Sequence, residues 1–123
     1  MSLTLSQYQP SGEEIVNFFL SAPLYENWRP DEIAAALCEA DAHNGIGIVI
    51  RDECLSGVCL GKFTSPTTYH VTQLHTKHPR DLGILIRYFL DRVPGCEITG
   101  TRRGRMIKYN TGRLIQKLLV KAD

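Results

Sequence analysis

The segment 80–93 constrains the fold of this chain more than any other, because it has the clearest helical pattern and lies between two predicted strands. Pro94 and Gly95 end the predicted helix, and the segments 68–76 and 96–102 on either side have the composition of strands. This arrangement predicts a strand–helix–strand crossover whose two strands pair in parallel. The apolar side chains of the helix recur at steps of three and four residues, on one face: Leu82, Leu85, Ile86, Phe89, Leu90 and Val93.

Two shorter helices are predicted in the first half of the chain. Ser11 and Glu14 form a capping box, in which the hydroxyl accepts from the amide three residues on and the carboxylate reaches back. Pro30 is placed in the first turn of the second helix, which Asn44 and Gly45 end. Three aromatic side chains are expected to seal the junction between these helices: Phe19, Tyr25 and Trp28.

The remaining segments complete a mixed sheet. Strands are predicted at 4–9, 46–50, 55–63, 68–76, 96–102 and 106–110, and a last helix at 111–122. Short polar turns join the strands at 46–50, 55–63 and 68–76, as in an antiparallel meander. The order is β-α-α-β-β-β-α-β(-β)-α. It predicts an α+β fold with a central, mostly antiparallel mixed sheet and helices on both faces, in a single domain spanning residues 1–123.

The charges divide unequally between the two halves of the chain. Residues 1–60 carry two basic and nine acidic side chains, a formal charge of −7, whereas residues 61–123 carry twelve basic and four acidic ones, a formal charge of +8. The total of +1 therefore hides a strongly polar molecule. Such a charge distribution favours an anionic partner on the C-terminal half and a basic partner on the N-terminal half.

The composition is that of a globular protein, with 43% hydrophobic and 22% charged residues. No apolar run approaches the roughly 18 residues of a membrane span, and the first residues have no basic segment like that of a secretory signal. We therefore expect no membrane partner and a reducing, cytoplasmic location. In that compartment the four cysteines are expected to be free buried thiols rather than disulfides: Cys38, Cys54, Cys59 and Cys96.

A metal site is not expected. His70, His75 and His78 are close enough in sequence to join Cys54 and Cys59 around one ion. Their spacing, however, does not match the ligand pattern of a zinc knuckle or ribbon.

The segment 76–83, which leads from a strand into the best helix, is a candidate anion site. Free backbone amides at a helix start, together with Lys77, His78 and Arg80, suit a phosphate or pyrophosphate. Gly83 would let the anion approach the backbone closely. An ordinary strand-to-helix loop would carry the same residues, so both interpretations stand.

The order of elements and the position of this loop resemble the GCN5-related N-acetyltransferase (GNAT) family, in which a strand opens into a loop of pattern Q/R-x-x-G-x-G/A and then a helix. Arg80 and Gly83 match this pattern, whereas Leu85 stands where the family has Gly or Ala. Family members hold the pyrophosphate of acetyl-CoA on these amides. The resemblance implies acetyl-CoA or another acyl-CoA as cofactor, bound by Lys77, His78, Arg80, Asp81, Leu82, Gly83 and Asn110.

The activity that the resemblance implies is acyl-CoA-dependent N-acyl transfer, or weak or no catalysis in a degenerate relative. Transfer to an amine needs a base for the amine and an acid for the departing thiolate. Candidate bases are His70 and His75, on opposite faces if their strand is regular, and Glu53 in a turn; the nearest acid is Tyr109. Lys117 stands near the place where the family often has a catalytic Tyr. Structural roles for these side chains are the alternative.

A second basic segment lies at 101–121, with seven basic side chains and no acidic one. Long cations at a predicted hairpin tip can reach a phosphate backbone, and Tyr109 can stack on a base. The alternative is a solvated basic turn and helix face. The candidate ligands of nucleic acid or another anion are Arg102, Arg103, Arg105, Lys108 and Arg113.

The resemblance also allows a function without catalysis, because small GNAT-like proteins occur as components of tailed-phage particles. In that case the chain is a structural or binding module within a phage particle, and its basic C-terminal half contacts DNA or other virion proteins. A stand-alone nucleic-acid-binding domain of another α+β fold is a third hypothesis. For the enzyme, the acidic N-terminal helices would border the acceptor site and suit a cationic substrate. Hydrolase and phosphotransferase motifs are absent from the sequence.

Overall fold

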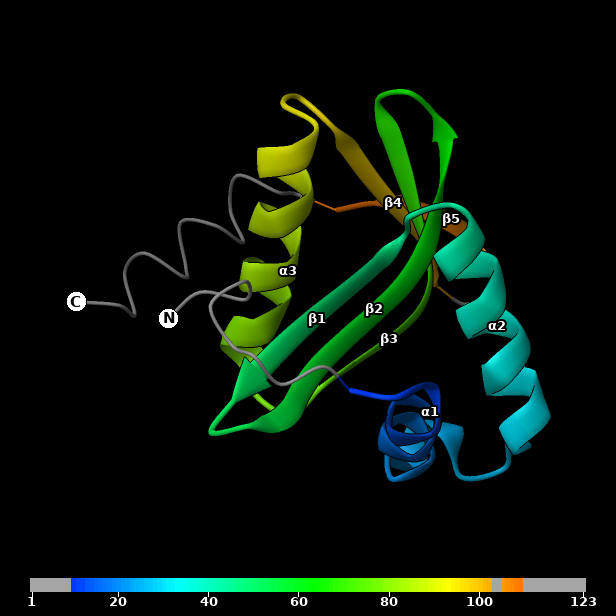
Figure 1. The fold of residues 1–123 in the computed structure, drawn as a ribbon. Coiled ribbons are helices and arrows are strands. Elements are labelled where there is room, and N and C mark those ends of the chain that lie inside the picture. The colour runs from blue at the N-terminus through cyan, green and yellow to red at the C-terminus, as the bar shows by residue number, and fades with distance from the viewer. Residues whose placement is uncertain (1–9, 103–104, 110–123) are drawn as a thin grey trace.

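The computed structural model describes residues 10–102 and 105–109 (Figure 1). The expected strand at 4–9 and the expected last helix at 111–122 lie outside these residues. Within them, the elements in chain order are α1 (Gly12–Leu20), the 3-10 helix η1 (Pro23–Tyr25), α2 (Pro30–Ala42), β1 (Ile46–Arg51), β2 (Cys54–Ser65), β3 (Thr68–Thr76), α3 (Pro79–Arg92), β4 (Glu97–Arg102) and β5 (Arg105–Lys108).

The five strands form one mixed sheet in the order β1-β2-β3-β4-β5. Neighbouring strands are antiparallel except for β3 and β4, which are parallel and joined through α3. Helix α3 covers one face of the sheet, and α1 and α2 cover the other (Figure 1). The predicted α+β fold, with a mostly antiparallel mixed sheet, a parallel crossover and helices on both faces, is therefore confirmed.

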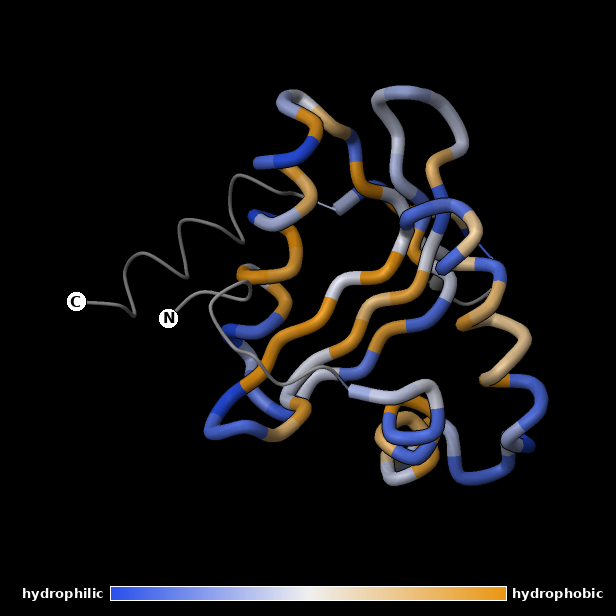
Figure 2. Tube along the Cα trace, in the orientation of Figure 1, coloured by the Kyte–Doolittle hydropathy of each residue, from blue (hydrophilic) through white to orange (hydrophobic). Residues whose placement is uncertain are grey.

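Two apolar cores lie on the two faces of the sheet, and the strands through them are largely hydrophobic (Figure 2). Under α1 and α2, residues such as Phe19, Ile33 and Val58 are almost fully buried. Under α3, Leu85 and Phe89 pack on Tyr69, whose ring stacks on that of Phe89 with 4.0 Å between centroids. Strands β1 and β2 are therefore covered on both faces, which explains their nearly continuous apolar sequence.

The helix boundaries follow the local signals of the sequence. The capping box at α1 is present, since the amide of Glu14 donates to the Ser11 hydroxyl at 3.1 Å and its carboxylate accepts from the Ser11 amide. Pro30 begins α2, and Asn44 follows its end with φ of 53°. Helix α3 begins at Pro79, so residues 80–85 are helical rather than part of a loop.

The cysteine prediction is half wrong. All four thiols are free, and Cys59 and Cys96 are buried, but Cys38 and Cys54 are exposed. Cys38 lies on the exposed side of α2, and Cys54 begins β2 directly after the tight, exposed turn at Asp52 and Glu53. Among the helices of the described residues, none is long and apolar enough to cross a membrane.

Candidate functional site

The parallel strands β3 and β4 stay together for only a short stretch. Their paired residues are Thr68 with Glu97, Tyr69 with Ile98 and His70 with Thr99. Strand β3 continues to Thr76, so the side of residues 71–76 that faces away from β2 has no strand partner in the described part of the chain. We call this stretch the open β3 edge.

The hydroxyl of Tyr25 occupies the open β3 edge. It accepts from the backbone N–H of Leu74 at 3.2 Å, and it lies 2.8 Å from Oε1 of Gln73 and 3.4 Å from the carbonyl oxygen of Leu74. The ring is held edge-on between Phe19 and Trp28, with centroids 5.1 and 5.2 Å away. Burial raises the pKa of Tyr25, which keeps the hydroxyl protonated and able to donate.

This role of Tyr25 has no sequence signal, although its packing between Phe19 and Trp28 was predicted. Tyr25 and Leu74 are 49 positions apart in sequence, and only the placement of η1 against the sheet brings them together. Gln73 was missed for the same reason.

His75, a candidate base, lies at the same end of β3. Its ring packs on that of Phe18 with 4.7 Å between centroids, and Lys77 Nζ is 5.5 Å from the same ring. Burial, and then the charge of Lys77, lower the pKa of His75, so the neutral imidazole is favoured. A neutral imidazole can accept a proton, as a base must.

The second candidate base, His70, lies on the same face of the sheet as His75. The prediction of opposite faces assumed a regular strand, but β3 has a bulge: Gln73 pairs with Leu60 while Val71 pairs with Gly61, which leaves Thr72 as an extra residue. One extra residue turns all later side chains to the other face. His70 Nδ1 lies 2.8 Å from the Thr99 hydroxyl, so its contacts are with β4.

The other catalytic candidates, Tyr109 and Glu53, are far apart in the sheet. Tyr109 follows β5, and its ring lies over Gly100, where an added Cβ would come within 3.0 Å of it. Together with Leu74, it lines an apolar cavity of about 10 Å³ under α3, large enough for one water at most. Glu53 is exposed in the β1–β2 turn, and among the described strands β1 and β5 are at opposite ends of the sheet order.

The start of α3, the predicted cofactor site, is filled by a carboxylate of the chain itself. Asp81 is fully buried. Its carboxylate accepts from Arg51 Nε at 3.0 Å and Nη2 at 2.7 Å, from the Ser56 hydroxyl at 2.6 Å and from the His78 amide at 3.3 Å. This network joins β1, β2 and α3. It was not predicted, because the spacing of these residues in sequence carries no motif.

Few backbone amides are left for an anion there. Pro79 has no N–H, and the amide of Asp81 donates to the carbonyl of His78 at 3.0 Å. Gly83 and Leu85 lie within α3 and are buried on its inner side, where Leu85 packs in the core under the helix.

The side chains of the other predicted cofactor residues lie in different surroundings. Lys77 and His78 are exposed, whereas Leu82 packs partly against the core under α3. Arg80 is half-buried, and its Nε has no hydrogen-bond partner in the described part of the protein. Asn110 lies outside the described residues.

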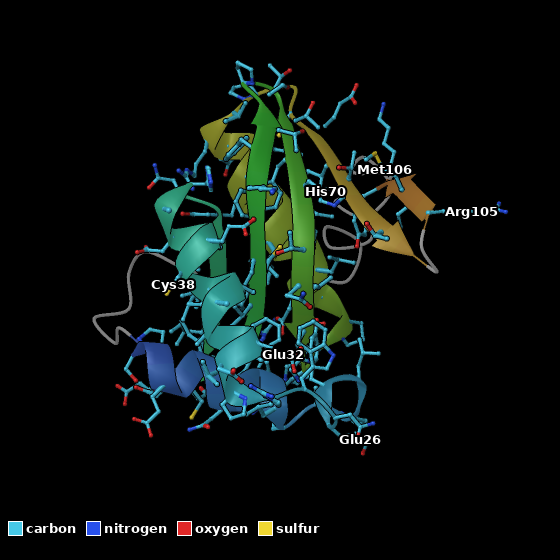
Figure 3. The ribbon with its side chains drawn as sticks, turned by 90° about the vertical axis from the view of Figure 1, so that its right-hand side faces the viewer. Glu26, Glu32, Cys38, His70, Arg105 and Met106 are labelled. Atoms are coloured by element: carbon cyan, nitrogen blue, oxygen red, sulfur yellow. The ribbon has the colours of Figure 1, made fainter. Side chains whose placement is uncertain are left out.

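The predicted basic hairpin is present as β4 and β5. Arg102 pairs with Arg105 at its end. Arg105 is exposed (Figure 3), and so is Lys108. Lys108 Nζ lies 3.4 Å from the Glu97 carboxylate, across the two strands. Two further candidates, Arg103 and Arg113, lie outside the described residues.

The structure is thus an α+β fold with a mixed sheet and a basic hairpin. At the start of α3, the Asp81 carboxylate takes up the nearby hydrogen-bond donors. Scans against protein-family models, the curated proteins and the solved structures each find no significant match to this chain. In the described residues, no three His, Cys, Asp or Glu side chains are grouped so as to hold a metal ion.

Proposed function

We propose that this chain is a non-enzymatic binding module with a GNAT-like framework, which binds an anionic partner through its basic C-terminal half. The observation that carries the proposal is the buried Asp81 carboxylate at the start of α3. A cofactor diphosphate needs backbone donors and a positive potential at that place. Here a carboxylate takes up the nearby donors of Arg51, Ser56 and His78.

The open β3 edge supports the same conclusion. An extended ligand that used the Leu74 backbone would have to displace the Tyr25 hydroxyl, leaving a buried phenol without its partners. An unsatisfied buried polar group costs about 1–3 kcal/mol. The backbone groups of Leu74 on the open edge are therefore already occupied by a side chain of the chain itself.

The partner that suits the basic hairpin is the phosphate backbone of a nucleic acid. Arg105 and Lys108 project from β5, and the sequence adds Arg102, Arg103 and Arg113 nearby along the chain. Long exposed cations bind phosphates without reading the bases. A virion component that contacts DNA, in a phage particle, is the form of this function that the resemblance favours; a cytoplasmic binding protein would use the same surface.

An N-acyltransferase is the second candidate function. It is favoured by the lowered pKa of His75, which favours the neutral imidazole that a base needs, and by the position of Tyr109 beside Leu74. In that reaction the base takes a proton from the amine, the amine nitrogen bonds to the thioester carbon, and the departing thiolate takes a proton from an acid. This function requires acyl-CoA to bind despite Asp81.

Two titrations test the proposal. Acetyl-CoA at concentrations up to about 1 mM is expected to give no binding heat and no rise in melting temperature. Fluorescence anisotropy with a short DNA duplex is expected to show binding that weakens steeply with salt. Replacing Arg105 and Lys108 by Ala should lower the slope of log K against log salt by about one for each phosphate that the variant no longer neutralises.

The matched control is Arg87→Ala, since Arg87 is an exposed cation that belongs to α3 and not to the hairpin. It should leave DNA binding nearly unchanged. Submillimolar acetyl-CoA binding with transfer to an amine would contradict the proposal in favour of the enzyme.

A further inference from the structure

Two large apolar side chains are strongly exposed in the described part of the chain: Leu24, with 78% of its surface accessible, and Met106, with 74%. Leu24 lies in η1, and Met106 lies in β5. A single exposed apolar residue is common and needs no explanation. Here, however, Leu24 lies near acidic side chains, whereas Met106 lies near basic ones.

The surroundings of Leu24 are acidic. Glu26 follows η1 at the lower end of the molecule in Figure 3, and Glu32 lies above it in the first turn of α2; both are exposed. The nearby cation Arg29 is already paired with Asp31 at 2.7 Å. We call Leu24, Glu26 and Glu32 the acidic end.

The surroundings of Met106 are basic. Arg105 precedes it on the strand, and Arg105 and Met106 project from the right-hand edge of Figure 3. Lys108 follows on the same strand and is exposed, with its Nζ 3.4 Å from the Glu97 carboxylate. Strand β5 is the last in the sheet order, so its outer side has no strand partner in the described residues. We call Arg105, Met106 and Lys108 the basic end.

We propose that the chain associates head to tail, with the basic end of one copy docked on the acidic end of a second copy. Each end has an apolar anchor beside exposed charges, which is the arrangement of a small interface with a polar rim. The opposite signs make the two ends complementary, which favours encounter and the correct orientation. Because the two surfaces differ, every copy keeps one free end, so association continues into a chain or closes into a ring.

This inference rests on the proposed function in one respect: self-association and anion binding would use the same exposed side chains of β5. The partner here is a second copy, and a nucleic acid competing for Arg105 is an outcome of the test. The charges involved are exposed, so the association is expected to weaken with salt.

Sedimentation velocity of the whole chain, without nucleic acid, tests the inference. At about 50 mM NaCl the weight-average sedimentation coefficient should rise with protein concentration, and at about 500 mM it should approach that of the monomer. Arg105→Glu alone and Glu26→Arg alone should each weaken the association about tenfold or more. A variant that carries both changes should recover it, because the charges are then exchanged.

Arg87→Glu is the matched control, with the same change of charge on an exposed residue of α3. It should leave the association unchanged, and circular dichroism should show that every variant is folded. Met106→Ser should weaken the association without changing the charge.

Three results would overturn the inference. One is a monomer at all concentrations up to about 1 mM in low salt. Another is equal weakening by Arg87→Glu and Arg105→Glu, which would reflect net charge alone. The third is DNA binding that needs Arg105 while any self-association does not, in which case the hairpin serves nucleic acid and the proposed function stands without this interface.

Discussion

The hydroxyl oxygen of Tyr25 lies 3.2 Å from the backbone nitrogen of Leu74, although 49 positions separate the two residues in sequence. This hydrogen bond joins η1 to β3 where β3 has separated from β4. The hydroxyl thus satisfies a backbone group that a neighbouring strand would otherwise satisfy. It connects η1 to the sheet and occupies the open β3 edge at Leu74.

Replacing Tyr25 by Phe should remove this connection and keep the ring packing on Phe19 and Trp28. We expect the unfolding free energy to fall by about 1–3 kcal/mol, since the Leu74 amide and Gln73 are left without their partner. Chemical denaturation measures the change, and hydrogen exchange should be faster at the Leu74 amide.

Tyr88→Phe is the control for Tyr25→Phe. It removes a hydroxyl that accepts from the exposed Arg92 side chain, at 3.3 Å, and the same ring packing on Phe89 remains possible. Water can replace an exposed hydrogen bond, so the control should change the stability little. Equal destabilisation by the two substitutions would contradict the role given to Tyr25.

Replacing Asp81 by Ala should be among the most destabilising single changes. Arg51 would keep its charge, 26% exposed, without its carboxylate, and Ser56 would have no acceptor. Breaking such a buried pair typically costs about 3–5 kcal/mol. Urea denaturation measures the change, and Asp31→Ala, in an exposed ion pair with Arg29, should alter the stability little. A small effect of Asp81→Ala would show that the network does not hold α3 to β1 and β2.

The stability of the protein should depend on the protonation of His75. Its folded-state pKa lies below the ordinary value of 6.5, because of burial and Lys77. The unfolded chain therefore takes up the proton first as the pH falls. The contribution of neutral His75 is present in full above about pH 6.5 and is lost as the pH falls through the folded-state pKa.

Unfolding free energies between about pH 7.5 and pH 5 measure this effect as a difference between the natural chain and His75→Gln. The variant should have the smaller slope. Lys77→Gln should have an intermediate slope, since the second cause of the shift is removed. Identical slopes in the natural chain and His75→Gln would rule out this linkage.

Thiol reactivity should divide the four cysteines into two pairs. Exposed Cys38 and Cys54 should react quickly with a thiol reagent in the folded protein. Burial raises the pKa of Cys59 to about 12 and also raises the pKa of Cys96, so both should react only on unfolding. Mass spectrometry of briefly labelled protein identifies the modified residues. Rapid labelling of Cys59 would indicate that the core under α3 opens readily.

Much of the fold could be predicted because its signals are local. The capping box at Ser11, Pro30 in the first turn of α2 and the apolar face of α3 each act within a few residues. The parallel crossover also follows from a strand, a helix and a strand in succession. The bulge at Thr72 could not be predicted, since it depends on pairing with β2, and it places His75 on the same face as His70 instead of the opposite one.

The candidate site was only partly predictable. The sequence marked the basic residues around the start of α3 and on the hairpin, because runs of charge are visible without a structure. It did not show that Asp81 turns inward to Arg51 and Ser56, 30 and 25 positions earlier.

The sequence by itself determined the order of the main helices and strands from α1 to β5, the crossover and the division of charge between the two halves, because these depend on neighbouring residues and on composition. Only the tertiary structure decided which polar groups are already satisfied. Tyr25 meets Leu74, and Asp81 meets Arg51, through the packing of distant segments on one sheet. Hydrogen bonds and ion pairs act over a few ångströms, so the availability of a donor for a ligand depends on which distant side chains the fold brings to it.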